Sequence, residues 1–341
     1  MMQFHRNVWY IAALSREVGS ELLPRKIVGQ NVVLFRSSSG QASAIADMCP
    51  HRFAPLSRGT LVGDTIECAY HGLRFDGGGR CTFNPQGELI SDNMHVRGYP
   101  VEERHDLIWI WPGDPDLADA AKIPDLTLLS SGEGRRASYS FLAAKFRYDI
   151  LIDNLLDSSH ADYLHKGSFS SGTFEQSETK VREGEAHDVT VTFTQFRGPP
   201  MPFDADLGPI SDRKYETRWY PGQIVVFRMT RVRAGEEFSQ GRVAYFAHVA
   251  TPADADTTNY FMWSMRDYAL DDPEVDIREA NNQFTVINCE DAPMLEAVHK
   301  RMDGAELMDL RPVVLPSDRG ALQVRRVMKR LLAAEAELAE A

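Results

Sequence analysis

Cys49-Pro50-His51 and Cys68-Ala69-Tyr70-His71 are the stretches of this 341-residue sequence that decide its fold. Sixteen residues separate them, and each supplies one cysteine and one histidine. Two thiolates and two imidazoles make a ligand set for a metal centre. A structural zinc site of mixed ligands usually pairs cysteine with cysteine and histidine with histidine. The pairing of unlike residues in each stretch therefore favours another centre.

A Rieske [2Fe-2S] cluster has the ligand set that this pattern offers, because two cysteines hold one of its irons and two histidines hold the other. We expect Cys49, His51, Cys68 and His71 to be these ligands. Neutral imidazoles leave the cluster less negative than four thiolates would, so it accepts an electron more readily. The alternative is a zinc knuckle or four unrelated buried side chains.

The segments around the two pairs predict a small β domain over residues 1–115. Short strand-like runs at 31–36, 42–46 and 107–111 are separated by turns, with Asp76-Gly77-Gly78-Gly79 as a hairpin signal. One run ends shortly before Cys49 and another at Cys68, which predicts two ligand-bearing loops at one end of the domain.

The rest of the chain predicts a second and larger domain of mixed structure, so the fold class is α+β. A connector containing proline and aspartate covers 116–126, and the second domain covers 127–341. Apolar patterns predict strands of an antiparallel sheet, a long helix and a final amphipathic helix. The strands are expected at 188–196, 223–232 and 241–250, and the helices at 273–298 and 320–341.

A second ligand set lies between residues 153 and 165. Asp157 and His160 are three apart, which would place them on one face of a helix. His160 and His165 are five apart, or ~140° out of line on a regular helix, so they share an ion only if the helix ends, tightens or bulges. Two histidines and a carboxylate form the facial triad of non-haem iron oxygenases. The carboxylate need not be local, and we expect it to be the distant Asp291, with its neighbour Glu290 as the alternative.

Composition narrows the range of functions. The chain has 37 Lys and Arg against 49 Asp and Glu, and its net charge of −12 argues against a nucleic-acid partner. We find no apolar run of membrane-spanning length, and no clear secretory signal. Four cysteines do not make a disulfide framework. We therefore expect a cytoplasmic protein.

The sequence resembles the oxygenase component of Rieske non-haem iron oxygenases, and most of all the aromatic O-demethylase branch. The matching motifs are Asn7-Val8-Trp9-Tyr10-Ile11-Ala12-Ala13, Cys49-Pro50-His51-Arg52, Tyr70-His71-Gly72-Leu73, Ile108-Trp109-Ile110-Trp111-Pro112, Asp153-Asn154-Leu155-Leu156-Asp157 and Val324-Arg325-Arg326-Val327. The resemblance implies a Rieske β domain followed by a helix-grip catalytic domain, in which a curved antiparallel sheet wraps a long helix. It also implies a homotrimer.

The resemblance also implies roles for individual residues. In the trimer, Asp157 would link cluster ligand His71 of one subunit to iron ligand His160 of the next. The alternative for Asp157 is a carboxylate on the surface of a helix. Asn154 matches a polar residue that lines the iron site. His248 matches a substrate-contacting histidine, or is a structural residue of a strand. Asn282 falls where the dicamba-type enzyme has a tryptophan, which argues against dicamba as substrate.

The implied activity is O-demethylation of a methoxylated aromatic acid, such as vanillate, to a phenol and formaldehyde. Its cofactors would be the [2Fe-2S] cluster and a mononuclear Fe(II), with O2 as cosubstrate. Electrons would come from NADH through a reductase, and possibly a ferredoxin. The alternatives are a ring-hydroxylating dioxygenase, an aryl-methyl monooxygenase and a stand-alone Rieske electron carrier.

Overall fold

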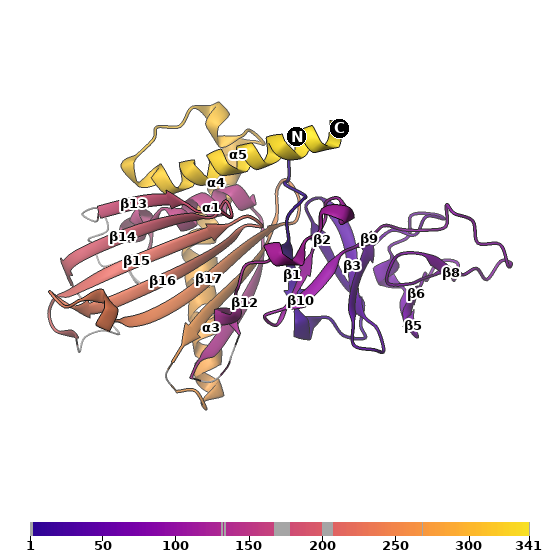
Figure 1. Ribbon diagram of the computed structural model, residues 1–341, viewed down its shortest axis with the longest axis horizontal. Coiled ribbons are helices and arrows are strands. Elements are labelled where there is room, and N and C mark those ends of the chain that lie inside the picture. The colour runs from indigo at the N-terminus through magenta and orange to yellow at the C-terminus, as the bar shows by residue number, and fades with distance from the viewer. Residues whose placement is uncertain are drawn as a thin grey trace. The chain divides into compact units, whose positions relative to one another are not determined.

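The structure is a computed structural model that describes residues 3–130, 132, 134–166, 178–199, 207–267 and 269–340. The chain divides into two compact units, drawn in Figure 1. The first unit contains residues 3–125 together with the short segment 251–255, and the second contains residues 126–250 and 256–341.

The first unit is built from small sheets, as its short apolar runs predict. A three-stranded sheet has the order β1-β11-β10, and two four-stranded sheets have the orders β2-β3-β4-β9 and β5-β6-β7-β8. The strands are β1 Tyr10–Leu14, β2 Leu23–Ile27, β3 Gln30–Arg36, β4 Ala42–Ala46, β5 Thr60–Val62, β6 Thr65–Glu67, β7 Arg74–Phe75, β8 Cys81–Phe83, β9 Gly98–Tyr99, β10 Val101–Arg104 and β11 Leu107–Ile110. Every residue of β1 and of β11 is buried, which explains why both read as unbroken apolar runs.

The hairpin between β7 and β8 shows the turn that the glycine run predicts. The Asp76 side chain accepts hydrogen bonds from the backbone N–H groups of Gly78 and Arg80, at 3.0 and 2.9 Å. Gly79 has φ +86°, and a Cβ there would lie 2.1 Å from the carbonyl oxygen of Val96. Only glycine satisfies both conditions.

The second unit is built on one seven-stranded sheet of order β12-β18-β17-β16-β15-β14-β13. Its strands are β12 Arg136–Ala144, β13 Glu178–Glu183, β14 Val189–Gly198, β15 Ser211–Tyr220, β16 Ile224–Arg233, β17 Arg242–Pro252 and β18 Thr258–Arg266. Long β14, β15 and β16 pair in antiparallel register along most of their length, and Figure 1 shows the sheet curving around its helices.

The helices of this unit and the turns beside them carry the predicted second ligand set. They are α1 Tyr148–Leu156, α2 Ala161–Leu164, α3 Pro273–Val286, α4 Ala292–Met302 and α5 Arg319–Glu340. α5 packs on the sheet face that carries Val191 of β14, because a Cβ on Gly320 would lie 2.5 Å from a methyl group of Val191.

The long helix predicted at 273–298 is interrupted, so that prediction is corrected. A π-helical turn, Ile287–Asp291, separates α3 from α4, and the N–H of Ala292 donates to the carbonyl of Ile287, five residues back. Pro293 supplies a physical reason, because it has no N–H to donate to Cys289 and its ring crowds the preceding turn.

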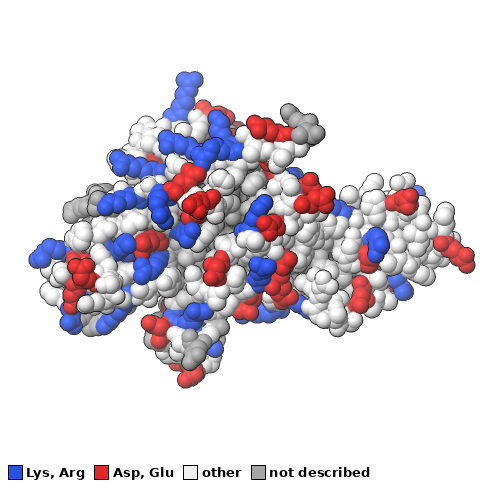
Figure 2. Space-filling view, in the orientation of Figure 1, with Lys and Arg blue, Asp and Glu red and all other residues white. Residues whose placement is uncertain are grey.

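The face of the molecule drawn in Figure 2 carries charges of both signs. Figure 2 shows Lys and Arg interspersed with Asp and Glu over the face drawn. Among the described residues, no helix is both long enough and apolar enough to cross a membrane.

Candidate active site

Cys49 and Cys68 open two loops of the same design in the first unit. In each loop the cysteine N–H donates to the carbonyl five residues later, from Cys49 to Ala54 at 2.9 Å and from Cys68 to Leu73 at 2.8 Å. The residue four after each cysteine, Phe53 or Gly72, donates back to the cysteine carbonyl at 2.9 Å. Both of these residues have positive φ, 59° and 75°.

The two loops bring the four predicted cluster ligands together. Cys49 and Cys68 are each 2% exposed and belong to one apolar cluster, while the rings of His51 and His71 lie 4.4 Å apart between centroids and nearer the surface. Burial, with the Cys68 thiol beside it, raises the pKa of Cys49 to about 11. Paired thiols inside and paired imidazoles outside are the donor set that a Rieske [2Fe-2S] cluster requires, so these residues fit that group.

Asp157 is not on the face of a helix, which corrects the expectation from its spacing to His160. α1 ends at Leu156, and Asp157 has extended backbone, φ −107° and ψ 96°. Its carboxylate accepts from the N–H and hydroxyl of Ser159, at 2.9 and 2.7 Å, and so caps a 3-10 turn, Ser158–His160. A residue that caps the start of a helical turn has non-helical backbone, so Asp157 cannot also continue α1.

The irregularity required between His160 and His165 is present. The 3-10 turn leads directly into the four-residue α2, and His165 stands at the end of α2 with φ −105° and ψ 26°. The two imidazoles therefore face each other, with their Nε2 atoms 3.2 Å apart.

Asp291 completes a three-residue group with these histidines. Its Oδ1 lies 3.6 Å from Nε2 of His160 and 3.4 Å from Nε2 of His165. With metal–ligand bonds of ~2.1 Å, ligand atoms stand ~3.0 Å apart at right angles and ~3.4 Å apart in a tetrahedron. The observed spacings match one shared ion.

Both histidines present a lone pair to this centre. Nδ1 of His160 donates to the backbone carbonyl of Asp157, and Nδ1 of His165 donates to Oε2 of Glu290 at 2.6 Å. A carbonyl and a carboxylate only accept, so each Nδ1 carries the proton and each Nε2 is free to bind a metal. The residues fit a mononuclear iron.

The choice between Asp291 and Glu290 follows from which ring nitrogen each carboxylate meets. Asp291 faces Nε2, whereas Glu290 meets Nδ1 on the other side of the His165 ring. Burial disfavours a charge on His165, but Asp291 and Glu290 outweigh it and raise its pKa. The amide of Asn154 donates to Oδ1 of Asp291 at 3.1 Å.

The two predicted substrate residues differ in their surroundings. His248 is buried on β17, and its Nδ1 lies 2.6 Å from the hydroxyl of Tyr260. Burial lowers the pKa of His248 to about 4, although Asp291 opposes the shift. Asn282 is exposed on α3, and this position gives no support to a substrate contact.

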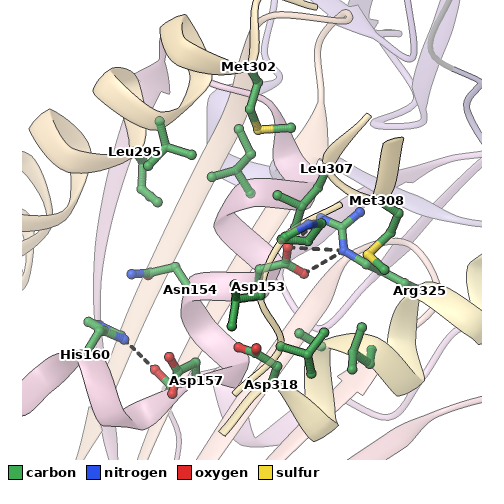
Figure 3. Close-up of a pocket in the computed structure, with 17 residues that line it drawn as sticks. Asp153, Asn154, Asp157, His160, Leu295, Met302, Leu307, Met308, Asp318 and Arg325 are labelled. Atoms are coloured by element: carbon green, nitrogen blue, oxygen red, sulfur yellow. Dashed lines mark hydrogen bonds and ion pairs between the residues drawn. The ribbon is translucent and has the colours of Figure 1, made fainter. Parts of the chain in front are cut away.

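A cleft of about 310 Å³ lies beside His160, between α1, α4, α5 and the segment after α4. Asn154, Asp157 and His160 line one side of it, as Figure 3 shows. Its rim is apolar and open, with Val313 87% exposed and Leu315 57% exposed nearby.

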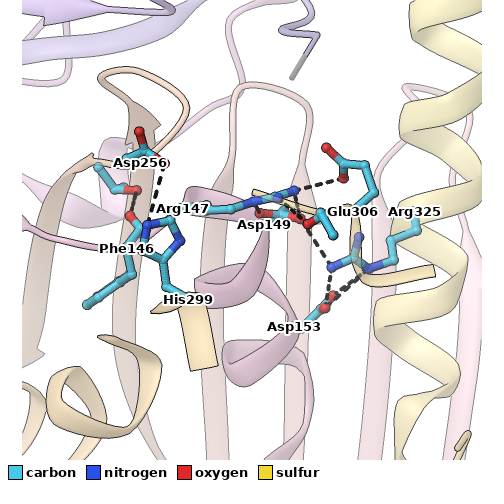
Figure 4. A network of polar contacts seen from close by, with 10 residues as sticks. Phe146, Arg147, Asp149, Asp153, Asp256, His299, Glu306 and Arg325 are labelled. Atoms are coloured by element: carbon cyan, nitrogen blue, oxygen red, sulfur yellow. Dashed lines mark hydrogen bonds and ion pairs between the residues drawn. The ribbon is translucent and has the colours of Figure 1, made fainter. Parts of the chain in front are cut away.

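A buried ionic network fixes α1, which carries Asn154 and leads to Asp157 (Figure 4). Arg147 binds both oxygens of Asp149 at 2.8 Å and also meets Glu306 at 2.7 Å. Arg325 of α5 meets Asp149 and grips both oxygens of Asp153. Burial opposes the charge on Arg325, yet these two aspartates raise its pKa above the ordinary value.

Paired Cys/His loops and a two-histidine, one-carboxylate centre define a Rieske-type oxygenase. Comparison with known families agrees. The Rieske [2Fe-2S] domain family matches residues 8–97, and the vanillate O-demethylase oxygenase C-terminal domain family matches residues 145–334. The chain belongs to the family of Rieske oxygenase components that includes the dicamba and vanillate O-demethylases.

Individual relatives cover nearly the whole chain. The oxygenase component of dicamba O-demethylase from Stenotrophomonas maltophilia is 35% identical, over 98% of this chain and 100% of the relative. The vanillate O-demethylase oxygenase subunit of Pseudomonas sp. (strain HR199 / DSM 7063) is 31% identical, over 99% and 98%. The crystal structure of dicamba monooxygenase bound to dicamba has a TM-score of 0.89 at 34% identity, over 98% and 100%.

These matches confirm the predicted family, fold class, enzyme class and cofactor types. The assignment of individual ligands stays a prediction from sequence and geometry. Two features were missed by the sequence reasoning: the π-helical turn, which Pro293 could have signalled, and the contact of Glu290 with His165, which adjacent acidic residues do not reveal.

Proposed function

We propose that this chain is the oxygenase component of a monooxygenase that O-demethylates a methoxylated aromatic acid, vanillate-like, to a phenol and formaldehyde. The observation that carries the proposal is the convergence of His160, His165 and Asp291, with both Nδ1–H groups directed away from the shared centre. Three protein ligands leave the remaining positions open, as in the facial triad of non-haem iron oxygenases.

The reaction balances with one NADH and one O2 for each methyl group. One atom of O2 is inserted into a C–H bond of the methyl group. The other atom is reduced to water by two electrons from NADH and two protons. In the resulting hemiacetal, the bond between the phenolic oxygen and the former methyl carbon breaks. The products are the phenol and formaldehyde. The bound iron supplies the activation of O2.

The chain's own residues would hold and shield these cofactors. Cys49, Cys68, His51 and His71 would bind the cluster. His160, His165 and Asp291 would bind the iron. Glu290 would keep the proton of His165 on Nδ1, and Asn154 would orient the Asp291 carboxylate. His248, buried and neutral, would offer a hydrogen bond to the substrate from β17.

We further propose a homotrimer in which Asp157 connects His71 of one subunit with His160 of the next. The exposed apolar side chains favour such an interface. Phe53 and Tyr70 in the cluster loops are 69% and 63% exposed, and Val313 near Asp157 is 87% exposed. Apolar surface of this kind beside a site indicates a partner.

We also propose that electrons come from NADH through a reductase, with or without a ferredoxin, and that the chain works in the cytoplasm. The proposed domain limits are 1–115 for the Rieske domain and 127–341 for the catalytic domain, with the connector at 116–126.

The test is formaldehyde release from methoxylated aromatic acids, vanillate included, with a surrogate reductase and NADH. Formaldehyde should form in a one-to-one ratio with the phenol. A hydroxylated ring without formaldehyde would replace O-demethylation by ring hydroxylation, and no product with any acid would refute the proposal.

The bridge is tested separately. Asp157→Ala should abolish turnover while the protein keeps its cluster spectrum and its iron. Retained turnover would remove Asp157 from the electron path.

A further inference from the structure

Arg213 of β15 is a buried cation that forms no ion pair with any residue that the structure describes. Its side chain is fully buried, and both Nη atoms lack a hydrogen-bond partner within the described part of the chain. Its Nε donates a long hydrogen bond of 3.4 Å to the hydroxyl of Ser211. The adjacent carboxylate, Asp212, accepts instead from the backbone N–H groups of Arg197 and Gly235. Burying an unpaired guanidinium is strongly unfavourable, so a protein that retains one is expected to pair it with a ligand.

A second unsatisfied group stands beside it. Gln195 of β14 is directly opposite Arg213 in the strand register and is 3% exposed. Neither its amide oxygen nor its amide nitrogen has a partner among the residues described. A bulge follows Gln195, and Gly198 at the end of that bulge makes room for the amide, since a Cβ there would lie 3.1 Å from Cδ of Gln195. Two neighbouring strands thus present a guanidinium and an amide, both buried and both unpaired.

These side chains lie on the same sheet face as His248. Arg213 is opposite Arg231 on β16, and His248 is opposite Val225 on the same strand. Positions 225 and 231 are six apart and therefore share a face, because side chains alternate along a strand. Gln195 shares this face with Val191, against which Gly320 of α5 packs. The unpaired groups therefore project from the helix-covered face, not toward bulk solvent.

We propose that Arg213 and Gln195 form a binding site for the carboxylate of an aromatic acid substrate, a proposal that rests on the O-demethylase function above. The two Nη–H edges of an arginine match the two oxygens of a carboxylate, and the Gln195 amide adds a third donor. The carboxylate would supply what the fold leaves out, an acceptor for each of these buried donors.

The distance along the sheet specifies the shape of that acid. The β16 residues opposite His248 and Arg213 are Val225 and Arg231, which are six residues apart. This corresponds to about 20 Å along the strand. An arginine side chain spans ~6 Å of this, which leaves more than the ~7 Å between methyl and carboxylate in a methoxybenzoate. Within the proposed class of methoxylated aromatic acids, the geometry therefore favours those with a spacer between ring and carboxylate, as in a methoxycinnamate, over a benzoate such as vanillate itself.

The experiment measures binding of four probes to the full-length, cluster-loaded protein under anaerobic conditions. These are 4-methoxycinnamate and 4-methoxybenzoate, each compared with its primary amide. Wild-type protein should prefer the cinnamate acid over its amide by at least tenfold. Arg213→Met should abolish that preference and leave amide affinity within about twofold, while the benzoate pair changes less. Arg228→Met is the matched control, since Arg228 lies on the next strand, half exposed and paired with Glu216, and should leave the ratio unchanged.

Thermal unfolding gives a second readout that a purely structural arginine would not produce. Without ligand, Arg213→Met should raise Tm, because it removes an unpaired buried charge, and 4-methoxycinnamate should no longer raise it further. The proposal is overturned if the cinnamate acid-to-amide ratio survives Arg213→Met, or if the variant lowers Tm in the absence of ligand. If the wild-type protein releases formaldehyde but Arg213→Met leaves the acid-to-amide affinity ratio unchanged, the carboxylate site is refuted and O-demethylation stands. If Arg213→Met abolishes that affinity ratio but the wild-type protein releases no formaldehyde, the carboxylate site stands and O-demethylation is refuted.

Discussion

Glu290 offers the sharpest test of the metal centre, because it touches a proposed ligand and is not itself one. Glu290→Ala removes the carboxylate that accepts from Nδ1 of His165 at 2.6 Å, a residue that is 1% exposed. A hydrogen bond to a charged group contributes about 1.5–3 kcal/mol, and each 1.4 kcal/mol is a tenfold change in affinity. We therefore expect Fe(II) to bind about 10- to 100-fold more weakly, as is typical when the outer partner of a metal-binding histidine is removed.

The assay is Fe(II) binding in competition with a chelator, on protein that keeps its [2Fe-2S] cluster. The EPR signal of the cluster should be unchanged, which separates local loss of iron from unfolding. Glu290→Gln retains an acceptor oxygen and should lose only a few-fold. Glu296→Ala, six residues further along the chain in α4, is the control. An iron affinity within twofold of wild type in Glu290→Ala would refute the assigned geometry.

Three further outcomes follow from burial and backbone geometry. Arg147→Met should lower the free energy of unfolding by about 1.5–3 kcal/mol in urea titrations, because Asp149 loses its bidentate partner and keeps only its contact with Arg325; a loss below 1 kcal/mol would contradict this. His248 has a folded pKa of about 4 against 6.5 unfolded, so the unfolded chain binds more protons between these values and stability falls as pH drops through 6.5. Between pH 7.5 and 5.5 this group should contribute a loss of about 1.4 kcal/mol that His248→Gln lacks, and equal slopes would contradict it. Gly79→Ala should prevent the β7–β8 hairpin from forming and reduce cluster content, because its Cβ would meet the carbonyl of Val96; full cluster content would disprove it.

The sequence predicts best where burial controls the pattern. The run at 42–46 is a strand with the same limits, and the run at 107–111 exceeds β11 by one residue, because buried strands leave a continuous apolar signal. The segment 251–255 could not be assigned to the first unit in this way, since its place depends on contacts with residues more than two hundred positions away. The side chain of Thr251, for example, donates to the carbonyl of Ile11.

The candidate site was predictable in its residue types and less so in its backbone. The five-residue spacing of His160 and His165 required an irregular helix, and the structure has one. The extended backbone of Asp157 was not evident, because an aspartate three residues before a histidine suits both a helix face and a cap. Arg213 gave no sequence signal, because a charged residue in a strand ordinarily faces solvent.

The segment 251–255 also has a consequence for how the chain matures on the ribosome. The backbone N–H groups of Val28 and Gly29 donate to the carbonyls of Pro252 and Ala253, both at 2.8 Å, and Lys26 meets Asp254. The first unit therefore remains incomplete until residue 255 has left the exit tunnel, long after its own 125 residues have emerged. A nascent chain stalled before that point should be more susceptible to protease in this unit than one stalled after it, and an expressed 1–125 fragment should unfold at a lower temperature than the same unit in the full chain.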